Sequence, residues 1–112
     1  MDSGDPMTEL TRVEQDIRKE RLRQIMRYGS ANGHPDGTGG PAREQMASLA
    51  KQARREATEV GDLNWLLILQ EEVHEVFACA PNSPEMREEL VQVAATVVAW
   101  IESYDRRGGK DA

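Results

Sequence analysis

Residues 63–103, LNWLLILQEEVHEVFACAPNSPEMREELVQVAATVVAWIES, decide the fold because two strongly apolar patterns meet there at a short turn. The second pattern opens with the signals that start a helix. Ser83 is a good N-cap residue, Pro84 suits the first helical position, and Glu85 places a negative charge in the first turn. Only four residues, 80–83, join the two patterns, so we predict two helices that pack antiparallel.

The rest of the chain is also helical in pattern. Apolar residues recur three and four positions apart before residue 29 and again between residues 42 and 60, as one face of an amphipathic helix requires. No stretch alternates with period two for long enough to make a strand. We therefore predict an all-α protein, a four-helix bundle with helices at about residues 7–28, 42–60, 63–79 and 84–104, the third capped by Asp62.

A segment rich in glycine and proline, GSANGHPDGTGGP at residues 29–41, separates the first two helices. Its composition excludes a regular element, and at about a dozen residues it is long for a helix connection. It is therefore either a functional loop or a flexible linker. We predict one domain over residues 7–105, with disordered ends at residues 1–6 and 106–112.

Composition limits the possible partners. The formal net charge of −6 argues against binding to nucleic acid or to an anionic membrane surface. No apolar run is longer than the five residues of Val97–Ile101, which is far too short to cross a bilayer, and no signal peptide opens the chain, so we expect a cytoplasmic protein. The single cysteine, Cys79, excludes an intramolecular disulfide framework, and we expect it in the core.

Acidic residues form a pattern on the last two predicted helices. At about 100° per residue, Glu72 and Glu75 fall together on the flank of the apolar stripe of their helix. Glu89 and Gln92 form a similar pair on the next helix, and antiparallel packing would bring the two pairs face to face. Carboxylates that converge in a partly apolar setting require a cation to remain ionised, and oxygen ligands favour Mg²⁺ or Mn²⁺. The alternative is that all of them are ordinary solvated helix residues.

Two other polar residues of the same predicted helix are expected to lie outside this acidic pattern. Glu71 and His74 point away from the flank that carries Glu72 and Glu75. We therefore expect His74 to be exposed to solvent.

Residues 63–103 resemble the core of the MazG-type, all-α nucleoside triphosphate pyrophosphohydrolases. The signature of that family is EExxE on one helix followed by ExxD on the next. Here EExxE occupies residues 71–75, and 13 residues separate Glu75 from Glu89. The resemblance implies that Glu72, Glu75, Glu89 and position 92 bind the metal ion. Position 92 is Gln92 and not Asp, which removes one negative charge from the expected set.

The resemblance also implies an activity: hydrolysis of a nucleoside triphosphate between the α and β phosphates, with Glu71 or Glu72 accepting a proton from water. Residues 20–39 resemble a region of short MazG-like proteins, which makes Arg23 and His34 candidates for substrate contacts. As an alternative, HPDG at residues 34–37 is simply a turn. Basic residues elsewhere are candidates for phosphate contacts or, alternatively, solvated surface residues: Lys51, Arg54, Arg55 and Arg87.

Two other functions remain open. One is a non-catalytic relative that keeps the bundle for oligomerisation or nucleotide sensing, with Gln92 as the main reason. The other is a hydrolase of another nucleotide such as a guanosine alarmone. The helix at 84–104 is apolar nearly all round, so we expect it to be buried on most sides and the bundle to be completed as a homodimer or homotetramer.

Overall fold

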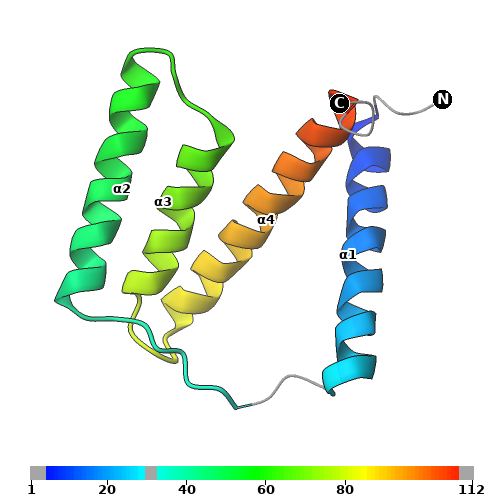
Figure 1. The fold of residues 1–112 in the computed structure, drawn as a ribbon, viewed down its shortest axis with the longest axis horizontal. Coiled ribbons are helices and arrows are strands. Elements are labelled where there is room, and N and C mark those ends of the chain that lie inside the picture. The colour runs from blue at the N-terminus through cyan, green and yellow to red at the C-terminus, as the bar shows by residue number, and fades with distance from the viewer. Residues whose placement is uncertain (1–4, 30–32, 109–112) are drawn as a thin grey trace. The chain divides into compact units, whose positions relative to one another are not determined.

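The computed structural model describes residues 5–29 and 33–108, and this part of the chain contains four helices and no strand (Figure 1). The helices are α1 (Pro6–Tyr28), α2 (Pro41–Glu59), α3 (Trp65–Ala78) and α4 (Pro84–Arg106). The predicted all-α class is therefore confirmed. Most of the two predicted disordered ends, residues 1–4 and 109–112, lies outside the described residues.

Polar side chains determine where the helices begin. Ser83 caps α4 as predicted, its Oγ accepting a hydrogen bond from the Met86 backbone N–H at 3.2 Å. Asn64 caps α3 by accepting from the Leu67 N–H at 2.9 Å. The prediction of Asp62 in this role was wrong, and α3 begins at Trp65, because the asparagine nearer the helix reaches the first free N–H groups.

The two ends of the described chain also differ slightly from the prediction. The Asp5 carboxylate accepts a hydrogen bond from the Met7 N–H at 2.9 Å and so caps α1. At the other end, α4 continues to Arg106. Residues 5, 6 and 106 therefore belong to the helical structure and not to disordered ends.

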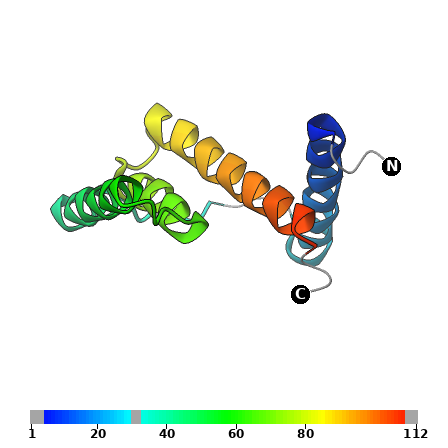
Figure 2. The ribbon, with the colours of Figure 1, turned by 90° about the horizontal axis from the view of Figure 1, so that it is seen from above.

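The chain divides into two compact units, one formed by residues 1–34 with 98–112 and the other by residues 35–97. The second unit holds α2, α3 and the first part of α4. Helices α2 and α3 run antiparallel and side by side, as Figures 1 and 2 both show. One buried apolar residue comes from each of the three helices, namely Ala50, Val76 and Met86.

The first unit joins α1 to the C-terminal part of α4. Val13 is the most deeply buried side chain of α1, with 2% of its surface exposed. Glu9 is also buried, and its carboxylate accepts two hydrogen bonds from the Arg106 guanidinium, at 3.0 and 3.4 Å. The paired charge explains how a glutamate is accommodated there.

Part of the glycine-rich segment is fixed in place within the second unit. The Gly39 N–H donates to the Phe77 carbonyl at 2.9 Å, and the Asp36 carboxylate accepts from the Asn82 N–H at 2.8 Å. Gly39 has φ +93°, and a Cβ on this residue would lie 3.4 Å from the Cys79 carbonyl oxygen. Residues 36–40 are thus held against the turn between α3 and α4, which excludes the flexible-linker alternative for them.

Helix α4 exposes apolar side chains within a single chain. Leu90 and Val91 expose 49% and 51% of their surfaces. The burial of α4 on most sides, which we expect from an oligomer, stays a prediction. No helix within the described residues has the length and apolar character needed to cross a bilayer.

Candidate metal centre

Three glutamates converge between α3 and α4 in the second unit. Glu72 and Glu75 lie one turn apart on α3, and Glu89 faces them from α4. One carboxylate oxygen of each residue lies within 4.8 Å of those of the other two, and all three residues are partly buried. The structure therefore brings together three of the four residues predicted to bind a metal ion, and we refer to Glu72, Glu75 and Glu89 as the carboxylate cluster.

Two oxygens of the cluster are buried without a hydrogen-bond donor. These atoms are Oε1 of Glu72 and Oε1 of Glu89. A buried polar atom without a partner destabilises a fold by about 1–3 kcal/mol, and more when the group is charged. A bound cation would satisfy both oxygens and would offset the repulsion between the carboxylates.

The electrostatics of the cluster disfavour the ionised carboxylates. Burial raises the pKa of Glu72, and the nearby charges of Glu89 and Glu71 raise it further. Burial also raises the pKa of Glu75, with the same two neighbours adding to the effect. A divalent ion would reverse the balance, since its charge favours the ionised form of every carboxylate that it contacts.

Glu71 lies in a different environment from the one expected. Its exposure is only 9%, and its Oε1 accepts a hydrogen bond from Arg54 Nη1 on α2 at 2.7 Å. The same nitrogen lies 3.8 Å from Oε2 of Glu72. Arg54, which sequence reasoning left as either a phosphate contact or a solvated side chain, is thus half-buried between two acids. No periodicity reveals such a pair, because its partners come from different helices.

Two other side chains of α3 and its C-cap also differ from expectation. His74 is half-buried, with its ring at right angles to that of Phe77 and 5.6 Å away between centroids, so the prediction of solvent exposure was wrong.

Cys79 is only partly buried, and its thiol donates to the Glu75 carbonyl at 3.2 Å. Burial and the nearby charge of Glu89 raise the thiol pKa. A protonated thiol is a poor metal ligand, so the available donors are carboxylate oxygens.

The remaining candidates lie on exposed surfaces. Gln92 is exposed on α4, one turn beyond Glu89, and Arg87 is exposed on the same helix. His34 is exposed as well. Arg23, in the first unit, donates to Glu20 on its own helix at 2.9 Å.

Fold and site together define an all-helical chain with a three-carboxylate cluster whose oxygen ligands suit a hard divalent cation. Comparisons of the chain with protein-family models, with curated proteins and with solved structures found no match. The resemblance of residues 63–103 to MazG-type enzymes stays a prediction.

Proposed function

We propose that this chain is a nucleoside triphosphate pyrophosphohydrolase that depends on Mg²⁺ or Mn²⁺ and produces a nucleoside monophosphate and pyrophosphate. The observation that carries the proposal is the carboxylate cluster, in which Glu72 and Glu89 each bury an oxygen that lacks a donor. Glu72, Glu75 and Glu89 would hold the ion. When bound, the ion would neutralise the polyphosphate and lower the pKa of water.

The two candidate proton acceptors differ in environment. Oε1 of Glu71 already accepts a hydrogen bond from Arg54, so this oxygen is occupied by a protein group. Oε1 of Glu72 has no hydrogen-bond donor, so one oxygen of this carboxylate can bind the ion while the other faces water. We therefore assign the general base to Glu72 and the positioning of Arg54 against the cluster to Glu71.

We also propose that the chain acts as a homodimer or homotetramer. Among the described residues only Val13, Ala50, Val76 and Met86 are buried apolar residues. Leu90 and Val91 on α4 remain about half exposed. Covering such side chains between copies of the chain would add about 25 cal/mol for each Å² of apolar surface removed from water.

A second candidate function rests on Gln92. The enzyme family has an aspartate at this position, and here a neutral, exposed amide takes its place. With one anionic ligand fewer, the cluster would bind a cation and a nucleotide without cleaving it, and the chain would act as a nucleotide sensor.

The test is a screen for pyrophosphate release over the canonical ribo- and deoxyribonucleoside triphosphates, with Mg²⁺, Mn²⁺ or EDTA. We expect metal-dependent release from at least one nucleotide, abolished by Glu89→Gln and retained by Glu88→Gln, a control at the exposed neighbouring position. Nucleotide binding without release would favour the sensor. The absence of both metal-dependent binding and release would contradict both candidates.

A further inference from the structure

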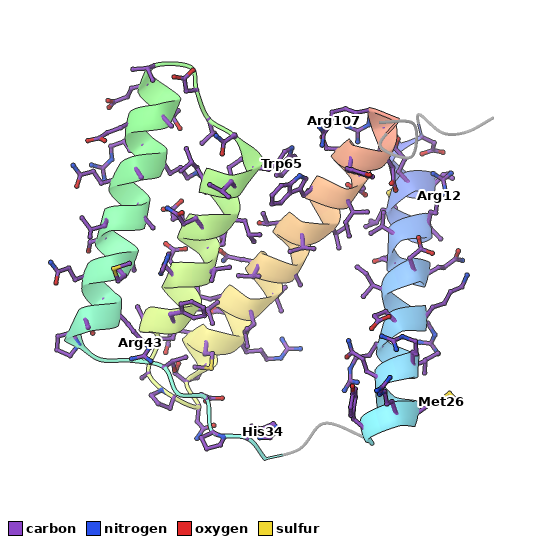
Figure 3. All side chains as sticks on the ribbon, viewed as in Figure 1. Arg12, Met26, His34, Arg43, Trp65 and Arg107 are labelled. Atoms are coloured by element: carbon purple, nitrogen blue, oxygen red, sulfur yellow. The ribbon has the colours of Figure 1, made fainter. Side chains whose placement is uncertain are left out.

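A hollow of about 330 Å³ lies in the second unit, lined by loop residues and by the same two helices, α3 and α4, that carry the carboxylate cluster. Loop residues 36–38 and Arg43 form one wall, and apolar side chains of α3 and α4 form the other. Figure 3 shows Arg43 where α2 begins, directly after this loop. The volume is at the lower end of the range for small-molecule sites, about 300–1,000 Å³, so it is large enough for a heterocycle.

The polar wall carries groups whose hydrogen-bonding capacity is not used. Oγ1 of Thr38 is buried and has no hydrogen-bond partner. Asp36 uses Oδ2 to accept from the Asn82 N–H. Arg43 forms no ion pair with any residue that the structure describes. The wall thus offers a donor, an acceptor and a hydroxyl that can serve as either.

The opposite wall is apolar and partly open. Phe77 on α3 exposes 44% of its surface, and Leu90 on α4 exposes 49%. An aromatic ring and aliphatic side chains facing a polar wall suit a flat ligand, which packs by its face and forms hydrogen bonds by its edge. A bare phosphate fits poorly because it leaves the apolar wall uncovered and meets the Asp36 carboxylate.

Consecutive residues connect the hollow to the carboxylate cluster. On α3, Glu75 belongs to the cluster and Val76 lines the hollow; on α4, Glu89 and Leu90 do the same. More directly, Glu72 of the cluster and Val76 of the hollow lie four residues apart on α3, and Met86 of the hollow and Glu89 of the cluster lie three apart on α4. Residues at these spacings are neighbours on one helix face, about 5–6 Å apart between Cβ atoms, so the two sites adjoin. One ligand with a flat group and a charged tail can therefore occupy both.

We propose that this hollow binds the base of a nucleotide whose phosphates meet the carboxylate cluster. The inference rests on the proposed function and assigns a role to the loop. Phe77 packs against the base, Arg43 donates to a carbonyl or ring nitrogen, and Asp36 accepts from an amino or ring N–H group. Thr38 completes the edge. The loop contributes through residues 36–38, whereas His34 does not line the hollow.

The test uses free nucleosides and metal-free protein in EDTA, so that neither a cation nor catalysis is needed. Guanosine, adenosine, cytidine and uridine are each titrated while the backbone amide resonances of the full chain are followed by NMR. We expect at least one nucleoside to shift the resonances of Thr38, Arg43 and Phe77 in a saturable way. Ribose and inorganic phosphate should leave them unchanged.

Variants identify the contacts. Thr38→Val and Arg43→Gln should each raise the dissociation constant about twofold to tenfold, as expected for the loss of one hydrogen bond. Arg55→Gln, at another exposed arginine of α2, is the matched control and should bind as the wild type does. Gly39→Ala should weaken binding as well, because φ at this position is +93° and the loop would move.

Three results would overturn the inference: no nucleoside shifts these resonances at millimolar concentration, inorganic phosphate shifts them instead, or Thr38→Val and Arg43→Gln both bind as the wild type does. The result is separable from that of the pyrophosphate screen. Nucleoside binding without pyrophosphate release supports the hollow and not the activity. Release without nucleoside binding supports the activity and refutes the hollow.

Discussion

Arg54 on α2 donates a hydrogen bond to Glu71 on α3 at 2.7 Å, while the same nitrogen lies 3.8 Å from Glu72. One guanidinium therefore both fastens two helices together and offsets the negative charge beside the carboxylate cluster. The stability of the second unit and the electrostatics of the site therefore both depend on the Arg54 side chain.

Replacing Arg54 with methionine should destabilise the protein by about 1–3 kcal/mol, because it leaves the Glu71 carboxylate without its partner. This range is below that for a fully buried pair, since a third of the Arg54 side chain is exposed. Urea unfolding measures the change. Arg55→Met, at an exposed position, should stay within about 0.5 kcal/mol of the wild type. Equal effects of the two variants would show that the ion pair contributes nothing specific.

Glu72→Gln should stabilise the metal-free protein at pH 7. Burial and neighbouring charges raise the pKa of Glu72 in the folded state, so its ionised form at neutral pH opposes folding. As the pH falls below the unfolded pKa of about 4.3, both states bind the proton and the advantage of the variant disappears. Thermal unfolding in EDTA from pH 4 to 8 measures the difference. A variant less stable than the wild type at pH 7 would contradict the proposed electrostatics.

Light scattering at micromolar concentration should give the mass of a dimer or a tetramer. The apolar side chains of α4 that remain half exposed, such as Leu90 and Val91, provide the reason. Val91→Glu should shift the mass toward the monomer, since a charge buried between copies is costly. A monomeric wild type would contradict this proposal.

Gln92→Asp should tighten Mg²⁺ binding and raise pyrophosphohydrolase activity. A glutamine oxygen can bind Mg²⁺ but adds no charge, whereas aspartate restores the acid of the ExxD pattern. Aspartate is shorter than glutamine by one methylene group, so we expect a partial gain. Calorimetry and the pyrophosphate assay measure the two effects. If Gln92→Asp changes neither, while Glu89→Ala abolishes turnover, position 92 lies outside the ligand set.

Local signals and helical periodicity predicted the elements and much of the site. Ser83 caps α4 through its own neighbours in sequence, and the spacing of Glu72, Glu75 and Glu89 across a short turn placed them together. The contact between Arg54 and Glu71 was not predictable, because it depends on how α2 rotates against α3.

The hollow was not predictable for a similar reason. It forms only because loop residues 36–40 are held against the turn between α3 and α4 by backbone hydrogen bonds that no motif specifies. Sequence composition showed that this segment is irregular. It did not show that residues 36–38 of the segment form the polar wall of the hollow.

The most direct test of the central claim is calorimetric titration of the metal-free protein with Mg²⁺ and Mn²⁺. We predict saturable binding at one site per chain. Glu75→Gln and Glu89→Gln should each weaken it by at least about tenfold, since even the loss of a group that only supports a ligand weakens binding by about 10–100-fold. Glu88→Gln should bind as the wild type does. No binding by the wild type, or equal binding by the cluster variants and the Glu88→Gln control, would contradict the assignment of Glu72, Glu75 and Glu89 as a metal centre.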